Sequence, residues 1–190
     1  MNFRRRLGGL LLAGALATAF GVGVDGTAHA AAGPPRPPFS PATNVLGSYY
    51  NLINQGSGKC ADVSGVSRNP GAIVWQWSCG NNDDNQLWAP QSVGGGYYQL
   101  VNRNSGLCMD IRTGGGVLNG MAIQQWTCDV SISSEHWLLQ PVDPPSGAYM
   151  LITQAGGKCL DLSNGSSANG AKIQMWDCNS GVTAQRWIFR

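Results

Sequence analysis

Short runs in which apolar and polar residues alternate fill the chain from residue 47 to residue 190. Pairs such as Asn-Gly, Gly-Gly and Ser-Gly separate these runs, and no segment keeps a helical period of apolar residues over about 11 positions. Alternation over a few residues between turn-forming pairs is typical of β-strands. The sequence therefore predicts an all-β domain over 47–190.

The same succession of runs occurs three times, with a period of about 50 residues. The three copies span about 47–90, 95–140 and 147–190, and they open on the expected strands Tyr50–Asn54, Tyr98–Asn102 and Tyr149–Thr153. One such unit cannot bury its apolar face alone, and two would leave exposed strand edges. Three units can close on themselves, which predicts a closed β-structure with threefold pseudo-symmetry.

The six cysteines follow the repeat, with two in each copy. In an exported chain this arrangement predicts three disulfides, each within one copy. The expected pairs are Cys60–Cys79, Cys108–Cys128 and Cys159–Cys178. Each would close a loop of about 20 residues, which is worth roughly 3 kcal/mol in the chain-entropy model. The Cys-x-x-Cys spacing of zinc sites is absent, so the sequence predicts neither a metal nor another cofactor.

The first 46 residues differ from the repeats in composition. Three arginines near the start, an uncharged apolar run over Leu7–Val24 and an Ala-x-Ala pattern ending at Ala30 form the layout of a secretory signal peptide. A membrane anchor is the disfavoured alternative, and Ala32 is a second candidate cleavage site. Residues 31–46 hold half of the prolines and predict a linker or tail. We therefore expect a secreted protein without membrane insertion after cleavage.

Charge and histidine content narrow the functions available to the mature chain. Removing residues 1–30 lowers Lys plus Arg from 12 to 9 and Asp plus Glu from 10 to 9, so the mature chain is near neutral. A neutral chain has no basic field for nucleic acid or anionic membranes. The only histidines are His29 and His136, and His29 leaves with the signal. Sites that need several histidines are thus excluded.

Catalysis is not expected from the acidic residues either. A glycosidase needs two carboxyl groups at a defined separation, whereas the recurrent acids here are aspartates at equivalent positions of the three copies. Threefold equivalence would hold these aspartates far apart. A Ser-His-Asp site could use only His136, which stands between Glu135 and Trp137. The sequence therefore predicts a binding protein and not an enzyme.

Two motifs recur in every copy. The first is Cys-x-Asp, which contributes Asp62, Asp110 and Asp161, and the second is a closing tryptophan, at Trp88, Trp137 and Trp187. A glutamine precedes the closing tryptophan by two positions in the first and third copies, and Glu135 takes its place in the second. The combination of Gln-x-Trp and Cys-x-Asp in three copies resembles the ricin B-type lectin domain, also called carbohydrate-binding module family 13. This resemblance covers residues 47–190.

The resemblance implies a β-trefoil, in which six strands form a barrel and six cap it, in units named α, β and γ. It also implies sugar binding without chemical transformation, through the aspartate, an aromatic residue near the second cysteine and polar residues around the closing motif. For the α unit these are Asp62, Trp77, Asn85 and Gln86; for the β unit, Asp110, Gln124 and Trp126; for the γ unit, Asp161, Gln174, Trp176 and Gln185. Such a set suits a sugar, because an indole covers its apolar face and a carboxylate accepts from its hydroxyls.

Each unit also departs from the family pattern. In the α unit, Trp75 replaces a polar residue and could either add a second aromatic platform or block the pocket. In the β unit, Ser134-Glu135 replaces Asn-Gln, and in the γ unit Ala184 replaces Asn. The sequence therefore ranks the pockets α, then γ, then β. The closing tryptophans are expected in the core. The tryptophans before the second cysteines could also serve packing, and the three aspartates could also cap turns.

These inferences lead to a secreted lectin with up to three shallow pockets for galactose-like or xylan- and arabinan-type glycans. Weak sites on one scaffold would gain affinity for polymeric glycans through effective concentration. The alternative is a non-catalytic targeting or protein-interaction subunit with degenerate sugar pockets. The sequence does not identify the sugar, because the loops around a pocket decide between galactose, xylose and arabinose.

Overall fold

A computed structural model describes residues 48–114, 116–143 and 146–190. The predicted signal peptide and proline-rich tail, residues 1–46, lie outside the described residues. Among the residues described, no helix is long and apolar enough to cross a membrane. The secondary structure over this part is twelve β-strands with five short 3-10 turns, as the alternating pattern predicts.

Each unit contributes four strands. The α unit contains β1 (Tyr50–Asn54), β2 (Cys60–Val63), β3 (Ile73–Trp77) and β4 (Leu87–Gly94). The β unit contains β5 (Tyr97–Asn102), β6 (Cys108–Ile111), β7 (Ile123–Trp126) and β8 (Trp137–Asp143). The γ unit contains β9 (Ala148–Thr153), β10 (Cys159–Leu162), β11 (Ile173–Trp176) and β12 (Trp187–Phe189). The 3-10 turns are η1 (Ser64–Val66), η2 (Asp84–Gln86), η3 (Ser133–Glu135), η4 (Ser163–Gly165) and η5 (Thr183–Gln185).

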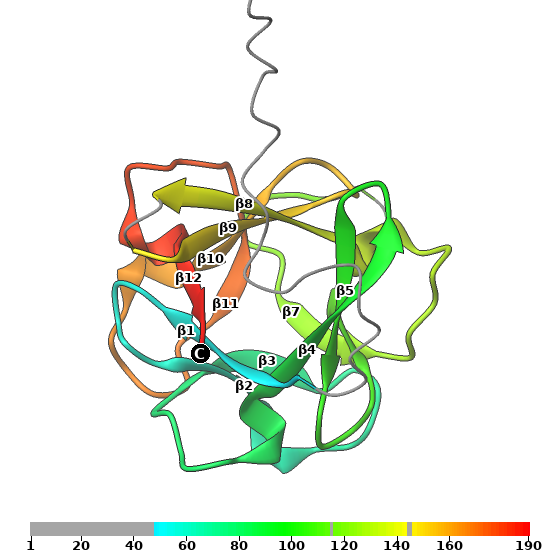
Figure 1. The fold of residues 1–190 in the computed structure, drawn as a ribbon, viewed down its shortest axis with the longest axis horizontal. Coiled ribbons are helices and arrows are strands. Elements are labelled where there is room, and N and C mark those ends of the chain that lie inside the picture. Colours follow the sequence, from blue (N-terminus) through cyan, green and yellow to red (C-terminus); the bar gives the residue numbers. More distant parts are fainter. Residues whose placement is uncertain (1–47, 115, 144–145) are drawn as a thin grey trace, which may run out of the picture. The chain divides into compact units, whose positions relative to one another are not determined.

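Six strands close into a barrel (Figure 1). The antiparallel pairs run from β1 to β4, β5, β8, β9 and β12, and β12 pairs again with β1. Closure removes the free edges that would otherwise invite pairing with other chains. The remaining strands form the hairpins β2–β3, β6–β7 and β10–β11. This arrangement confirms the predicted β-trefoil with three pseudo-symmetric units.

The three hairpins contact one another through the turn that precedes each second hairpin strand. The backbone N–H of Gly71 donates to the Gln125 carbonyl of the β unit at 2.8 Å. Equivalent bonds of the same length run from Gly120 to the Met175 carbonyl and from Gly170 to the Gln76 carbonyl. The three glycines have φ values of 84°, 83° and 77°, which favour glycine strongly. Pairing of β3 with β7 adds to these links. The turn of one unit is therefore built onto the hairpin of another.

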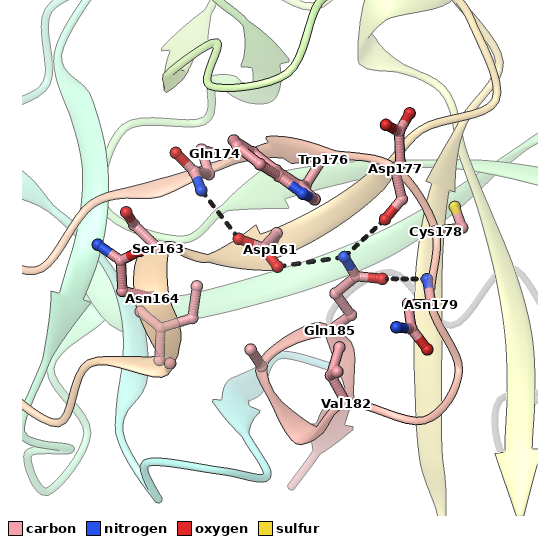
Figure 2. A pocket seen from close by; sticks show the side chains of 13 residues that line it. Asp161, Ser163, Asn164, Gln174, Trp176, Asp177, Cys178, Asn179, Val182 and Gln185 are labelled. Carbon is pink, nitrogen blue, oxygen red and sulfur yellow. Dashed lines mark hydrogen bonds between the residues drawn. The ribbon is translucent and has the colours of Figure 1, made fainter.

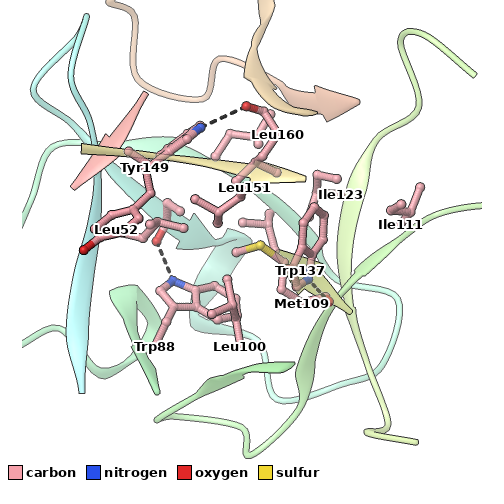
Figure 3. Close-up of a cluster of buried hydrophobic side chains, with 14 of the residues drawn as sticks. Leu52, Trp88, Leu100, Met109, Ile111, Ile123, Trp137, Tyr149, Leu151 and Leu160 are labelled. Atoms are coloured by element: carbon pink, nitrogen blue, oxygen red, sulfur yellow. Dashed lines mark hydrogen bonds between the residues drawn. The ribbon is translucent and has the colours of Figure 1, made fainter. Parts of the chain in front are cut away.

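The closing tryptophans lie in the core, as predicted: Trp88 and Trp137 are seen in Figure 3, and Trp187 belongs to the same buried cluster. All three indoles are fully buried. Each Nε1–H donates to the carbonyl of the middle residue of Cys-x-Asp in its own unit: Trp88 to Ala61 at 3.0 Å, Trp137 to Met109 at 3.2 Å and Trp187 to Leu160 at 2.9 Å. The closing motif thus holds the strand that carries the aspartate, and a buried polar N–H is satisfied.

The three disulfides have the predicted connectivity: Cys60–Cys79, Cys108–Cys128 and Cys159–Cys178. No free cysteine remains among the described residues. Each bridge joins the first residue of an aspartate-bearing strand to the loop that follows the exposed tryptophan of the same hairpin. The bridges therefore restrain the loops that surround each candidate pocket.

Candidate functional site

Strand register places each Cys-x-Asp aspartate opposite a residue of the next strand. The pairs are Asp62 with Trp75, Asp110 with Gln124 and Asp161 with Gln174. A 3-10 turn then brings the closing motif to the other side of the aspartate, because η2, η3 and η5 each end two residues before the closing tryptophan. The aspartates are only 6–7% exposed. Buried carboxylates need partners, and these partners differ between the units.

In the γ unit, two amides hold the carboxylate of Asp161 (Figure 2). Gln174 Nε2 donates to Oδ1 at 3.0 Å, and Gln185 Nε2 donates to Oδ2 at 3.1 Å. Gln185 is itself fixed by the backbone, since its Nε2 also donates to the Asp177 carbonyl and its Oε1 accepts from Asn179 N–H. An ionised carboxylate has about four acceptor positions, so Asp161 keeps acceptor capacity for a ligand.

A pocket of about 690 Å³ opens over Asp161. Trp176 lines it and is 44% exposed, which leaves much of the indole free for a ligand. Val182 and Ala184 add apolar surface from the segment before the closing motif. The pocket thus combines an aromatic wall, apolar rim residues and a recessed carboxylate. Ala184 occupies the place of Asn85 in the α unit, so the bond that Asn85 makes to its aspartate has no counterpart here.

In the α unit, Trp75 takes the place of Gln174. Its Nε1–H donates to Asp62 Oδ1 at 2.9 Å, and its ring stacks on Trp77 with centroids 5.6 Å apart and an angle of 28°. Asn85 Nδ2 and Gln86 Nε2 both donate to Asp62 Oδ2 at 2.8 Å. Three donors therefore use the acceptors of Asp62, and burial raises its pKa above the usual range.

The two units differ in the number of side chains that donate to the aspartate, which is two at Asp161 and three at Asp62. Motif completeness favoured the α unit, since Asp62, Trp77, Asn85 and Gln86 are all present. In the folded chain that complete set, together with Trp75, satisfies the carboxylate internally. The γ unit has fewer of the family's polar residues, and its Asp161 therefore has fewer hydrogen-bond partners than Asp62 and lies beneath an open pocket.

In the β unit, a serine compensates for the missing asparagine. Gln124 Nε2 donates to Asp110 Oδ2 at 2.8 Å, and Ser134 Oγ donates to Oδ1 at 2.7 Å. Sequence reasoning did not assign Ser134 to the site. The alignment of the repeats placed Ser134 at the position of Asn85 but counted it as a departure, although a hydroxyl can donate as an amide does.

Glu135 does not reproduce the role of the closing-motif glutamine. Its Oε2 accepts from Asp129 N–H at 2.9 Å and from Gln99 Nε2 at 2.8 Å, whereas Oε1 is buried without a partner among the described residues. The side chain is fully buried, and burial raises its pKa, with the nearby carboxylate of Asp110 adding to the effect. An ionised Glu135 cannot donate to Asp110 as Gln185 donates to Asp161.

The tryptophans before the second cysteines are exposed in every unit. Trp77, Trp126 and Trp176 are 42%, 47% and 44% exposed. Turn glycines of other units lie beside two of them: a β-carbon at Gly71 would lie 3.5 Å from the Trp126 ring, and one at Gly170 would lie 3.8 Å from Trp77. The indoles are therefore supported from a neighbouring unit while much of their surface stays accessible, as ligand platforms require.

Comparison with known proteins gives results that agree with this geometry. A 34% identical designed threefold-symmetric protein, ThreeFoil, superposes with a TM-score of 0.68 over 74% of this chain and 96% of its own. An exo-β-1,3-galactanase from Clostridium thermocellum is 32% identical with a TM-score of 0.68, and the match covers 75% of this chain but 30% of the galactanase. The C-terminal half of an earthworm R-type lectin, solved with GalNAc, shares the fold at 17% identity, with a TM-score of 0.59 over 76% of this chain and 98% of its own.

The search of curated protein sequences returned no match. The family model of ricin-type β-trefoil lectin domain-like proteins matches residues 39–126 and 133–190, which is most of the chain. The match contains all three aspartates, all three closing tryptophans and five of the six cysteines. The protein therefore belongs to the ricin-type β-trefoil lectin domain-like family.

Proposed function

We propose that the protein is a secreted, non-catalytic lectin whose principal carbohydrate site is the γ pocket. The observation that carries this proposal is the recessed carboxylate of Asp161, which keeps free acceptor positions beside the exposed indole of Trp176. A pyranose has an apolar C–H face and a rim of hydroxyls. Trp176 would stack on the face, and Asp161 would accept from the hydroxyls through charge-assisted hydrogen bonds.

A galactose-containing glycan is the ligand class that we favour over xylan and arabinan. The 32% identical galactanase acts on β-1,3-linked galactose, which supports this choice for a chain of the same fold. The three disulfides and the predicted signal peptide support an extracellular location. The α and β pockets would contribute less, because Asn85 adds a third donor to the aspartate in one and Glu135 alters the other.

Removing the γ platform should weaken sugar binding strongly. We expect Trp176→Ala to raise the Kd for a β-1,3-galacto-oligosaccharide about tenfold, because loss of an aromatic contact and its buried area is worth about 1.4 kcal/mol or more. Isothermal titration calorimetry, with xylo- and arabino-oligosaccharides as competitors, measures the change.

The matched control is Trp126→Ala, which removes an equally exposed indole from the β unit. Equal losses for both variants would overturn the assignment of the principal site to the γ unit. Failure of the unmodified protein to bind any glycan would favour the alternative of a protein-interaction subunit.

Replacing Trp75 by glutamine should create a second strong site. Glutamine stands opposite the aspartate and donates to it in both other units, so a glutamine at position 75 could replace the indole's bond to Asp62 while removing the ring that stacks on Trp77. We expect the calorimetric stoichiometry for the same oligosaccharide to rise from about one toward two, because an amide is smaller than an indole and leaves room above the carboxylate. An unchanged stoichiometry would show that Trp75 does not obstruct the α pocket.

A further inference from the structure

The chain contains three Asn-Gly pairs, at Asn119, Asn164 and Asn169. In such a pair the glycine amide nitrogen can attack the side-chain carbonyl carbon of the asparagine. A bond forms between this nitrogen and Cγ, the bond from Cγ to the side-chain nitrogen breaks, and ammonia leaves with the proton. Water then opens the resulting cyclic imide at either carbonyl, which yields aspartate or isoaspartate. Glycine favours the attack because it has no side chain to obstruct it.

Tertiary hydrogen bonds restrain both reacting groups in two of these pairs. Asn119 Nδ2 donates to Asp177 at 2.7 Å, and Gly120 N–H donates to the Met175 carbonyl at 2.8 Å. A reaction here would have to break both bonds before the nitrogen could reach Cγ. The pair at Asn119 is therefore protected by the contact between the β and γ units.

The pair at Asn169 is restrained in the same way. Asn169 Oδ1 accepts from Lys59 Nζ at 2.6 Å and from Ser78 N–H at 3.1 Å. Gly170 N–H donates to the Gln76 carbonyl at 2.8 Å. Here the contact between the γ and α units protects the asparagine.

The third pair has neither restraint. Asn164 is exposed, and no hydrogen bond to its side-chain amide or to Gly165 N–H occurs in the described part of the chain. Asn164 also has a φ of 56°, a left-handed conformation that is unusual for a residue with a side chain. Both residues line the γ pocket, and Figure 2 shows Asn164 at its edge.

We propose that Asn164 is a site of spontaneous deamidation that modifies the rim of the γ pocket. The reaction needs only water and the chain itself. Its products place a new carboxylate in a pocket that already holds Asp161 and Asp177. Like charges disfavour the ionised form of a neighbouring carboxylate, and isoaspartate also lengthens the backbone of the rim by one atom. The effect on ligand binding rests on the proposed lectin function, whereas the modification itself does not.

Peptide mapping of the full chain tests the modification directly. The protein is incubated at mildly alkaline pH and physiological temperature, digested, and analysed by mass spectrometry that separates aspartate from isoaspartate. We expect the peptide with Asn164 to convert at least about tenfold faster than those with Asn119 and Asn169, since a single net hydrogen bond is worth about that factor. Equal rates at the three positions, or an intact Asn164, would overturn the proposal.

Two variants separate the modification from its effect on the pocket. Asn164→Gly matches Gly65, which occupies the same place in the α unit with a φ of 65°, and so removes the reactive amide without disturbing the turn. Whatever its starting affinity for the sugar, this variant should keep that affinity through the incubation, whereas the affinity of the unmodified protein should fall. Asn164→Asp mimics one product and should bind with a Kd at least about threefold higher. If Asn164→Asp binds normally, the effect on the pocket is refuted while the measured modification still stands.

Discussion

Replacing Trp137 by alanine should lower the free energy of unfolding by about 3–5 kcal/mol, the range for truncating a buried tryptophan. The indole is fully buried within the core of leucines, isoleucines and methionines shown in Figure 3. Its loss leaves a cavity and also leaves the Met109 carbonyl without the 3.2 Å bond from Nε1. Denaturant unfolding, monitored with the disulfides intact, measures the change.

The control for this prediction lies in the same unit. Trp126→Ala removes a side chain of the same kind that is 47% exposed, so it should change the free energy of unfolding by about 0.5 kcal/mol or less. A comparable loss of stability from both variants would mean that the exposed tryptophans serve packing. The lectin interpretation of these residues would then lose its main structural support.

Replacing Glu135 by glutamine should stabilise the protein at neutral pH by about 1–3 kcal/mol, which is the usual cost of a buried unsatisfied polar group. Glu135 Oε1 is buried and has no hydrogen-bond partner within residues 48–114, 116–143 and 146–190, and the carboxyl group lies near Asp110. In the other units, the equivalent glutamine donates to the aspartate and to the carbonyl before the second cysteine, as Gln86 does to Ser78. A glutamine at position 135 could make the same bonds to Asp110 and Thr127.

The gain should depend on pH in a defined direction. Burial raises the pKa of Glu135 above its ordinary value of 4.5, so the folded state holds this proton at pH values where the unfolded state has released it. Stability from this group is therefore present below about pH 4.5 and is lost as the pH rises through the folded-state pKa. The advantage of Glu135→Gln should be smallest in acid and grow toward neutral pH.

The converse variant provides a further test of the same interaction. Gln185→Glu removes the donor to Asp161 and to the Asp177 carbonyl, so it should destabilise the γ unit at neutral pH and weaken sugar binding there. A pH-independent gain for Glu135→Gln, or no loss for Gln185→Glu, would refute the role that we assign to this position.

Most of the fold follows from local features of the sequence. Three equivalent units are predicted by the recurrence of two cysteines, a Cys-x-Asp step and a closing tryptophan about every 50 residues. Because the units are equivalent, each cysteine is expected to pair within its own unit. Three units of alternating strands have few ways to bury their apolar faces without free edges. The buried positions of Trp88, Trp137 and Trp187 follow from the same repetition, because an apolar residue that recurs at the end of each unit is best placed at a shared core.

The relative binding strength of the three pockets could not be predicted from the repeated spacing of residues in the sequence. Motif matching counts which residue types are present, whereas binding depends on which acceptors remain unused after folding. Asn85 illustrates the difference, because it gives Asp62 a third donor that Asp161 lacks, with Ala184 at the equivalent place. Ser134 illustrates the opposite case, in which an apparent loss is compensated by a hydroxyl at the same place.

The sequence by itself determined the number of units, their strands and the disulfide pairing, because these depend on spacing that repeats along the chain. Only the tertiary structure decided how many donors each aspartate accepts from, and, among the described residues, which buried carboxyl oxygen lacks a partner and which Asn-Gly pair is unrestrained. These properties depend on hydrogen bonds between segments that are distant in the chain or belong to different units. Identical motifs therefore acquire different chemistry once each is packed against its own neighbours.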